Sequence, residues 1–456
     1  MGGMGSALSL ARQGFTNITV WEQALYLEEV GAGINVPPNL GRILSRWGVM
    51  DICKAEGVAI ERANVLDCET DEIISSAAYS AHMVADYGYP FILETSPVGH
   101  VTSTSPNTQT VHRAALQKSL VRGALDTGHV KLMTDQIITE YDFDKTRLLV
   151  RNEDTDEDEW VQADLLICAD GIKSRARAAI YKRLGIADSV EDTGQAAYRI
   201  MVRRNLAKDD PELLKLFSSK QSWRWIGEKR HVMGYPINAG ELFNISTSQP
   251  DEHFGEKDSW TALGDKSAMV ATFHDFPERV KKLLSLVPEH EVLEWRLRAH
   301  KPLPVWVDHN VALVGDACHP TLPHIAQGAA QAIEDAAALG IVLSRIKSRN
   351  QIHSALMVYQ NIRKPRTDWA VSMAAHNSIS LHQDKATREA SLAMARLALA
   401  NEGGAEDGSD KEDDQVCVDK LASKELRDKL FQYDIALETE QRFDKLFAEE
   451  LMKQRD

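Results

Sequence analysis

The chain has 456 residues, of which 43% are hydrophobic and 26% are charged, and this composition is typical of a globular protein of two or three domains. A formal net charge of -15 disfavours nucleic acid as a partner, because phosphate binding needs a basic surface. Five scattered cysteines, no CxxC pair, no run of about 18 apolar residues and no secretory signal predict a cytoplasmic protein without disulfides, a zinc site or a membrane span.

The sequence begins inside a pattern that is typical of dinucleotide-binding units. Residues 2–13 carry small residues at helical spacing and stop at Gly14, and the β-branched run "NITVW" predicts a buried strand that leads to Glu22. The usual fingerprint is a strand, GxGxxG, a helix, a second strand and an acid about 20 residues further on. Gly2 and Gly3 occupy its last glycine positions and Glu22 its acidic position, but no first strand precedes them. We therefore expect either a shortened sequence or a protein that has lost this strand and binds its dinucleotide poorly.

Turns and helices follow this unit. The segment "GAGINVPPNLGRILSRWG" contains a glycine turn at Gly33, a Pro-Pro-Asn turn and an amphipathic helix. The segment "TVHRAALQKSLV" has apolar residues at helical spacing behind His112 and Arg113. The stretch "RLLVRNEDTDEDEWVQADLLICADG" predicts a hairpin with an acidic tip and then a buried strand that ends at Asp170 and Gly171.

From about Tyr181 the sequence changes to alternating β-type segments, which predict an antiparallel sheet in a second domain. These segments are "AAYRIMV", "SWRWIG", "KRHVMGYPI" and "ELFNISTS". The run "NVALVGDA" predicts a last buried strand, and beyond residue 340 the pattern is helical to the end. The acidic stretch at about 402–415, "EGGAEDGSDKEDDQ", is predicted to be a disordered insertion between C-terminal helices.

One segment combines several unusual features: "GDACHPTLPHIAQGAAQAIEDAAALG", residues 315–340. It has a turn-forming Gly-Asp, two prolines and a small-residue helix that starts after Gln327. The free N–H groups and the positive dipole end of such a helix favour an anionic ligand. A metal site is the alternative, but Cys318, His319 and His324 are not at one-face helical spacing, and prolines interrupt the segment. We therefore expect a ligand-binding helix start and no metal.

In order along the chain, the motifs GG…E, GAGI…PPN, HRAAL, ADGIKSR and GDACHP…AQGAAQAIEDAA resemble those of the FAD-dependent single-component aromatic hydroxylases. The resemblance is greatest to the fungal, salicylate-hydroxylase-like branch, N-terminally truncated, and it extends to Ala326, where many relatives have glycine. It implies an α/β fold: a Rossmann-like FAD-binding domain of the GR2, para-hydroxybenzoate-hydroxylase-like type, with an inserted antiparallel β-sheet substrate domain and a helical C-terminus. The expected boundaries are 1–75 plus 101–180 plus 303–345 for the FAD-binding domain, 76–100 plus 181–302 for the β-rich substrate domain and 346–456 for the helical region.

The resemblance also implies a cofactor, FAD, and a transient co-substrate, NAD(P)H. Asp316 is expected to accept hydrogen bonds from the ribityl hydroxyls, and the helix start at Gly328 to stabilise negative charge on the reduced flavin. Next to Asp170, the run Lys173–Arg175 either offers charge to NAD(P)H or forms a solvated helix start. The expected cofactor-binding residues, in chain order, are Gly2, Gly3, Glu22, Gly33, Arg113, Asp170, Asp316, Gln327, Gly328 and Ala329.

The implied reaction uses NAD(P)H to reduce FAD and then transfers one oxygen atom from a C4a-hydroperoxyflavin to an aromatic ring, ortho or para to a hydroxyl. The expected catalytic residues are Tyr235, which accepts or relays the phenol proton, Arg199, which pairs with a carboxylate or phenolate, and Pro323, which packs beside the reactive edge of the flavin. His231 and His324 are secondary candidates. The aromatic residues expected to fill the core of the sheet are Tyr198, Trp225 and Phe243.

Two alternatives stay open from the residues alone. A flavin monooxygenase that tailors a fungal secondary metabolite shares the same motifs, and the missing first strand leaves room for a truncated, FAD-poor and inactive remnant. The expected partners are a small aromatic substrate and O2, with no nucleic acid, and the chain is expected to be a monomer or a homodimer.

Overall fold

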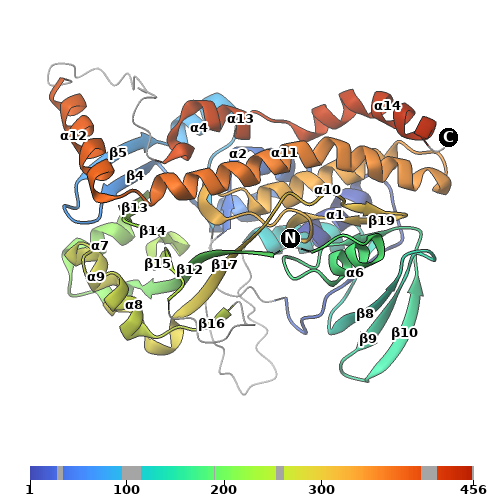
Figure 1. Ribbon diagram of the computed structural model, residues 1–456, viewed down its shortest axis with the longest axis horizontal. Helices are drawn as coiled ribbons and strands as arrows, with labels where there is room; N and C mark the ends of the chain where they lie inside the picture. The colour runs from blue at the N-terminus through green and yellow to red at the C-terminus, as the bar shows by residue number, and fades with distance from the viewer. Residues whose placement is uncertain (28–33, 95–114, 189, 253–260, 402–418, 454–456) are drawn as a thin grey trace.

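The computed structural model describes residues 1–27, 34–94, 115–188, 190–252, 261–401 and 419–453. A dinucleotide-binding half lies at one end of the elongated molecule, an eight-stranded sheet lies at the other, and long helices run along one side of both (Figure 1). Gly33 and Arg113, two of the expected cofactor-binding residues, lie outside the described residues, as does the acidic stretch at 402–415. In the described part, no helix is both long and apolar enough to cross a membrane.

The dinucleotide-binding half contains two separate sets of paired strands. β1 (Ile18–Trp21) pairs in parallel with β7 (Val130–Met133), and β11 (Leu166–Cys168) pairs in parallel with β19 (Val311–Leu313). β18 (Val307–Asp308) extends the second set in the antiparallel direction. In the usual strand order the first strand of the fingerprint stands between these two sets. Among the described residues, no strand occupies that place.

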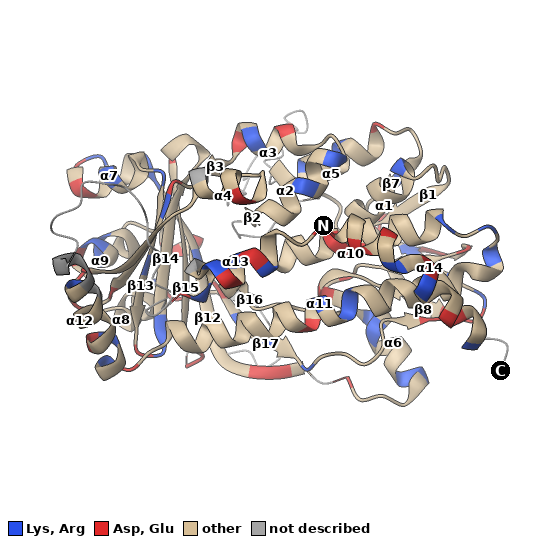
Figure 2. Cartoon of the chain, turned by 90° about the horizontal axis from the view of Figure 1, so that it is seen from above, with Lys and Arg blue, Asp and Glu red and all other residues tan. Residues whose placement is uncertain are grey.

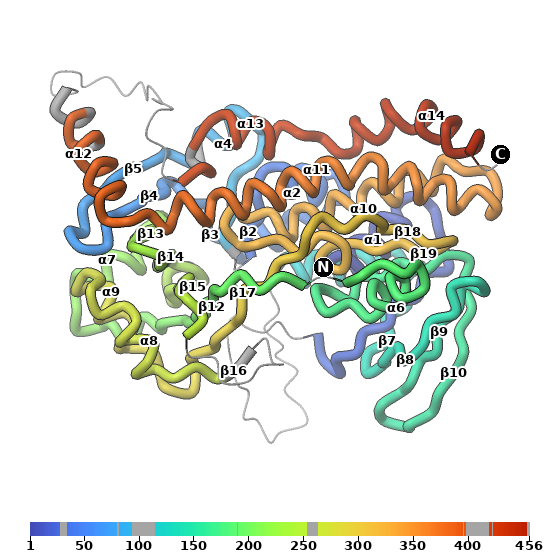
Figure 3. Tube along the Cα trace, viewed as in Figure 1, coloured from blue at the N-terminus to red at the C-terminus, as the bar shows by residue number. Residues whose placement is uncertain are grey.

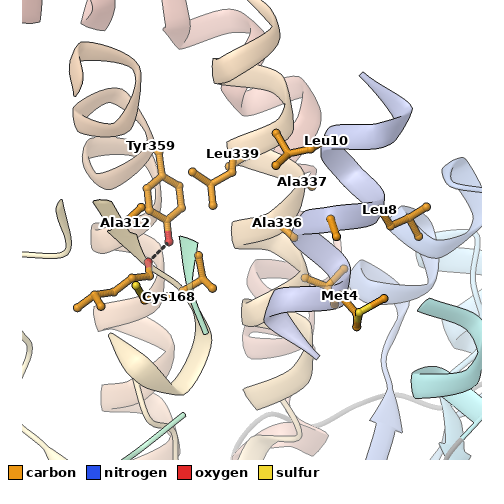
Figure 4. Packing of buried hydrophobic residues seen from close by; sticks show 14 of the residues in the cluster. Met4, Leu8, Leu10, Cys168, Ala312, Ala336, Ala337, Leu339 and Tyr359 are labelled. Atoms are coloured by element: carbon orange, nitrogen blue, oxygen red, sulfur yellow. Dashed lines mark hydrogen bonds between the residues drawn. The ribbon is translucent and has the colours of Figure 1, made fainter. Parts of the chain in front are cut away.

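Two helices, α1 (Gly2–Arg12) and α10 (Gly328–Ser344), pack closely beside these strands (Figure 4). Gly5 permits this approach, because a Cβ there would lie 2.6 Å from Ile333 Cδ1. Tyr359 of α11 (Ile352–Leu381) donates its hydroxyl proton to the Leu313 carbonyl at 2.9 Å, which ties α11 to β19. The buried side chains of α1 and α10 that Figure 4 labels are Met4, Leu8, Leu10, Ala336, Ala337 and Leu339.

The other half is built on an eight-stranded sheet that is antiparallel except for the parallel pair β4 and β13. In spatial order its strands are β16 (Thr261–Leu263), β17 (Leu293–His300), β12 (Val190–Arg203), β15 (Leu242–Pro250), β14 (Arg230–Ile237), β13 (Gln221–Gly227), β4 (Arg62–Asp67) and β5 (Ile73–Ala78). One face packs against α7 (Pro211–Ser218), α8 (Lys266–Thr272) and α9 (Glu278–Ser285). Tyr198, Trp225 and Phe243 are buried in this layer, as the sequence predicted. The other face is turned toward the dinucleotide-binding half.

Strand pairing bears on where the β-rich unit begins. β4 and the first half of β5 precede residue 76, where that domain is expected to start, but both strands are paired into the large sheet. We therefore propose that residues 62–78 belong to the β-rich unit.

Two small sheets and the remaining helices complete the fold. The predicted hairpin with the acidic tip is confirmed by the antiparallel pair β9 and β10. α11 runs from the large sheet to the end that carries β8 and α14 (Figure 2), and the N-terminus lies in the middle of the molecule, beside α1 and α10 (Figure 3). The strands of the first small sheet are β8 (Gln136–Asp142), β9 (Arg147–Asn152) and β10 (Glu157–Gln162), and those of the second are β2 (Ile34–Val36), β6 (Ile92–Glu94) and β3 (Val58–Ala59). The helices are α2 (Pro38–Arg46), α3 (Met50–Glu56), α4 (Ser80–Tyr87), α5 (Ala115–Leu125), α6 (Arg175–Leu184), α12 (Lys385–Asn401), α13 (Lys424–Phe431) and α14 (Ile435–Lys453).

Candidate active site

The start of α10 faces open space. A Cβ added to Gly328 would meet no atom within 4 Å, although this residue opens a helix whose body is buried. Gln327 precedes it and is fully buried, yet the amide nitrogen Nε2 of Gln327 has no hydrogen-bond partner in the described part of the chain. Ala329, the next residue, is half-buried. The first N–H groups of α10, which have no partner within the helix, therefore lie beside open space.

Two glycines at the start of α1 come close to the ends of β11 and β19. A Cβ on Gly2 would lie 3.3 Å from Val314 Cγ2, and a Cβ on Gly3 would lie 3.4 Å from Ala169 Cβ. Larger residues would push the start of α1 away from these strand ends. The expected glycines thus allow a helix start and two strand ends to meet at one edge.

Asp316 lies directly after β19, in the short 3-10 turn η4 (Gly315–Ala317). Gly315 adopts φ +61°, a left-handed conformation that favours glycine. The Asp316 side chain is exposed to solvent, yet desolvation by the surrounding protein raises the pKa of its carboxyl, against the opposing effect of His319. An accessible carboxylate of this kind can accept hydrogen bonds from a ligand.

A buried ionic network holds this turn in place. Asp335 of α10 accepts hydrogen bonds from the Gly315 backbone N–H at 2.9 Å, from His319 Nε2 at 2.5 Å and from Arg363 Nε at 2.8 Å. Burial alone would raise the pKa of Asp335, but the charges and hydrogen bonds of His319 and Arg363 outweigh it and lower the pKa to about 2. Asp335 is therefore a carboxylate that fixes the backbone next to Asp316.

The same network reaches the first turn of α10. Arg363 Nη1 donates to Glu334 Oε2 at 2.6 Å, and Asn39 Nδ2 donates both to Glu334 Oε1 at 2.8 Å and to Gln327 Oε1 at 3.1 Å. The expected site residues did not include Asn39, Glu334, Asp335 and Arg363. A signal was present, because "IED" places two adjacent acids in an otherwise apolar helix, and buried acids need partners.

The grouping of Cys318, His319 and Asp335 is the one place in the described chain where three metal-ligating side chains come within 4.8 Å of one another. The spacing of the histidines did not indicate this grouping. Both oxygens of Asp335 already accept hydrogen bonds, and the Arg363 cation compensates its charge. We therefore assign these residues to the network that holds the turn.

Asp170 lies after β11 and caps the start of α6. It accepts from Ser174 Oγ at 2.5 Å and from the Ala176 backbone N–H at 3.1 Å. Arg177 was not among the expected site residues; its buried guanidinium donates to the carbonyls of Ile172 at 2.8 Å and Ala317 at 3.1 Å. Arg177 thus links the turn after Asp170 to the turn that carries Asp316.

Glu22 follows β1 directly. Its backbone pairs with Met133 and Gln136, and its Oε1 accepts from the Ala24 N–H at 3.0 Å. Among the described residues, the Glu22 carboxylate has no cationic partner within ion-pair distance. Its remaining acceptor sites are open at the carboxyl end of the strand.

A cavity of about 550 Å³, part of it open to solvent, lies between the large sheet and the loop before α10. Pro323 and His324 of this loop form one wall, and Met233 of β14 and Arg224 of β13 form another. Arg224 Nη1 forms an ion pair with Asp419 Oδ2 at 2.5 Å, so its charge is compensated. The loop residues that line this cavity, Pro323, His324 and Ala326, therefore lie two to five positions before Gly328, the first residue of α10.

Arg199 and Tyr235 share the sheet face that borders this cavity, although neither lines it. His231, Met233 and Tyr235 alternate along β14 and so point to one face, and Met233 lines the cavity. The pairing Arg199↔Ser246↔Met233 places Arg199 on the same face. Burial raises the pKa of Tyr235 to about 12, with Arg199 opposing this, and burial lowers the pKa of Arg199. Tyr235 is thus a neutral hydroxyl at neutral pH.

Comparison with known proteins agrees with this geometry. The model of the FAD binding domain family matches residues 1–374. The chain is 31% identical to the FAD-dependent monooxygenase ntnJ of Nectria sp over 81% of this chain and 80% of that protein. It is 30% identical to 3-hydroxybenzoate 6-hydroxylase 1 of Aquipseudomonas alcaligenes over 80% of this chain and 84% of that protein. The solved structure of a salicylate hydroxylase substrate complex superposes with a TM-score of 0.70 at 19% identity, over 96% of this chain and 95% of that one, and it supports the fold.

The resemblance and the fold class expected from the sequence are therefore confirmed. The matched family model covers both strand sets, the large sheet and most of α11. The chain belongs to the FAD binding domain family, among oxidoreductases that include FAD-dependent monooxygenases and aromatic hydroxylases.

Proposed function

We propose that the protein hydroxylates a phenolic ring with NAD(P)H and O2, in the cavity between the large sheet and the Pro323–Ala326 loop. One observation carries this proposal. Pro323, His324 and Ala326 line the cavity, and Gly328, whose added Cβ would meet open space, follows Ala326 by two residues, so a ring in the cavity and a flavin at the α10 start would be neighbours. Such proximity is what oxygen transfer needs, since the reacting atoms must approach closely.

The residues present fit FAD. The open space at Gly328, the unpartnered Gln327 amide and the exposed Asp316 carboxylate offer room, a donor and an acceptor on two elements, α10 and η4, that contact each other. We propose that Asp316 holds the ribityl chain and that Gln327, Gly328 and Ala329 face the pyrimidine ring. Bound FAD supplies hydride acceptance from NAD(P)H and activation of O2.

For the other end of the cofactor, the proposal rests on the edge where α1 meets β11 and β19. Gly2 and Gly3 are assigned to the pyrophosphate, because their N–H groups open α1 without side chains in the way. Glu22 is assigned to the adenosine ribose hydroxyls through its open carboxylate oxygens. Asp170 contributes to NAD(P)H recognition by ordering the start of α6.

The chain's own groups act on the substrate as follows. Tyr235 keeps its proton at neutral pH and lies on the sheet face that borders the cavity, so it is assigned to relay a proton to or from the substrate oxygen. Arg199 has a buried Nε without a partner in the described part of the chain and supplies positive charge to a phenolate. Pro323 forms the rigid wall that separates the cavity from the α10 recess and limits water there.

The test is a screen of the purified protein. We expect a yellow protein whose NAD(P)H oxidation is stimulated by hydroxybenzoates, hydroxynicotinates or larger phenols, with a hydroxylated product in proportion to O2 consumed. Product formation must be measured, because stimulated oxidation alone also arises from uncoupled turnover to hydrogen peroxide. A flavin-containing protein that forms no hydroxylated product with any of these rings would contradict the proposal.

Replacing Tyr235 with phenylalanine tests its role in the second half of the reaction. We expect Y235F to slow hydroxylation by about 100-fold, because a positioned proton donor or relay is lost, while reduction by NAD(P)H changes little. Stopped-flow measurement of both half-reactions checks this. Y198F is the matched control, since Tyr198 lies buried on the opposite face of the same sheet. Equal loss in both half-reactions of Y235F would assign Tyr235 a different role.

A further inference from the structure

Three histidines meet at the edge of the substrate cavity. They are His231 of β14, His324 of the loop before α10 and His382, which follows the last residue of α11. The ring centroid of His231 lies 5.0 Å from that of His382 and 5.6 Å from that of His324. His324 lines the cavity and has a buried Nε2 without a partner among the described residues. His231 lies on the sheet face that borders the cavity.

A chain of hydrogen bonds leads from the sheet to His231. Ser248 Oγ donates to Gln195 Oε1 at 3.1 Å, so the Gln195 amide nitrogen faces the opposite way. Gln195 Nε2 lies 3.0 Å from His382 Nδ1, and His382 Nε2 lies 2.9 Å from His231 Nδ1. The chain is therefore Ser248, Gln195, His382 and His231, with each link within hydrogen-bond distance.

This chain permits only one arrangement of protons on neutral imidazoles. An amide nitrogen always donates, so His382 Nδ1 must accept and His382 must carry its proton on Nε2. That proton is donated to Nδ1 of His231, which must then carry its own proton on Nε2. The only lone pair on the His231 ring is already used by His382.

The three rings are neutral in this environment. Burial lowers the pKa of His231 well below its usual value, the pKa of His324 to about 3 and the pKa of His382 to about 4. The Arg224 cation nearby lowers all three further. The proton arrangement above therefore applies at neutral pH.

We propose that Gln195 is a positioning residue that fixes His231 as its Nε2–H tautomer, so that His231 donates a hydrogen bond to a substrate oxygen and does not act as a base. The site would then select rings that present a carbonyl or phenolate oxygen, which accepts a hydrogen bond at this point. This inference rests on the proposed hydroxylase function for its consequence, but its structural part is tested without turnover.

The decisive variant is Gln195→Glu. A carboxylate accepts where the amide donated, so His382 must carry its proton on Nδ1, and His231 must carry its proton on Nδ1 and expose an unprotonated Nε2. Nitrogen NMR of the holoenzyme with ¹⁵N-labelled histidine distinguishes protonated from unprotonated ring nitrogens, and spectra of H231N and H382N identify the signals among the 15 histidines. We expect Nε2–H for His231 in the wild type and Nδ1–H in Q195E.

Q249E is the matched control, because Gln249 is also buried on a neighbouring strand, and its Oε1 accepts from Thr247 at 2.6 Å, as a carboxylate oxygen can. It should leave the His231 tautomer unchanged. If Q195E does not fold, Q195M replaces it: the side chain keeps a similar length but no longer donates to His382 Nδ1, and both tautomers of His231 should appear. Wild-type protein with Nδ1–H on His231, or Q195M with Nε2–H alone, would overturn the inference.

Substrate binding separates this inference from the proposed function. Flavin difference spectra with phenolate-type rings should show about tenfold weaker binding to Q195E than to Q249E, the loss of one hydrogen bond from a neutral donor. A protein that hydroxylates no aromatic ring but shows the tautomer exchange would remove the proposed function and retain the positioning role of Gln195. Unchanged tautomers in a fully active Q195E enzyme would remove the positioning role of Gln195 and retain the proposed function.

Discussion

Replacing Asp335 with asparagine is expected to lower the free energy of unfolding by about 3–5 kcal/mol, because Arg363 would remain a buried charge with one of its two carboxylate partners gone. Arg363 is fully buried, and the new amide nitrogen would face donors from Gly315, His319 or Arg363. Urea unfolding of wild type and D335N, followed by far-UV circular dichroism, measures this difference. The flavin content of the purified variant should fall with it, since the Gly315 N–H no longer anchors the turn of Asp316.

D158N is the matched control for this variant. Asp158 also forms a two-point ion pair with an arginine, at 2.8 and 2.9 Å, but both side chains are solvent-accessible, so its loss should change the free energy of unfolding far less than the loss of Asp335. The pKa of Asp335 is about 2 in the folded protein and about 3.9 in an unfolded chain. Its contribution to the free energy of unfolding is therefore full above pH 4 and is lost as the pH falls toward 2. Similar unfolding curves for D335N and D158N would show that the network does not stabilise the fold.

Replacing Gly328 with leucine is expected to abolish FAD retention while leaving the fold intact. No atom lies within 4 Å of the added Cβ, so the side chain enters the recess and not the core. Leucine is also a better helix former than glycine. We expect FAD affinity to fall at least about 100-fold, or about 2.8 kcal/mol, with an unchanged unfolding midpoint of the apoprotein. Equilibrium dialysis with FAD and thermal unfolding of apoprotein measure the two effects separately.

Two comparison variants sharpen this result. Gly5→Leu should destabilise the apoprotein, because its Cβ would lie 2.6 Å from Ile333 Cδ1 between α1 and α10. Asp316→Ala should weaken FAD binding less than Gly328→Leu, since it removes an acceptor and adds no obstacle. If Gly328→Leu keeps its flavin, the recess at the start of α10 is not where the flavin lies, and the proposed site must be moved.

Local sequence patterns predicted the elements of this fold well, because each depends on neighbours in the chain. The run "VALVG" and the small residues after Gln327 gave β19 and α10, and the alternation around Tyr235 gave β14. Pairings between distant segments were not predictable in this way. The parallel pairing of β4 with β13 depends on how two separate segments pack, and no periodicity within either one indicates it.

The site residues also fall into those that a local motif identified and those that only the packing of distant segments brings together. Asp316, Gln327 and Gly328 were identifiable because a motif places them together, although their roles remain predictions. Arg363 lies 28 residues after Asp335, on another helix, and the bond between them follows only from the packing of α10 against α11. His382 lies in a segment without a motif, so its contact with His231 had no sequence signal.

The helix α11 contacts three parts of this arrangement. In its first half, Arg363 holds Asp335 beside the turn of Asp316; further along, Asn377 donates to the His324 carbonyl at 2.8 Å; directly after the last residue stands His382. Its 30 residues span about 45 Å, and inserting one residue would rotate everything beyond it by about 100°. As homologues diverge toward new substrates, this rod can therefore accept exchanged side chains but not a change of length, and variation in chain length is left to the loops around the sheet.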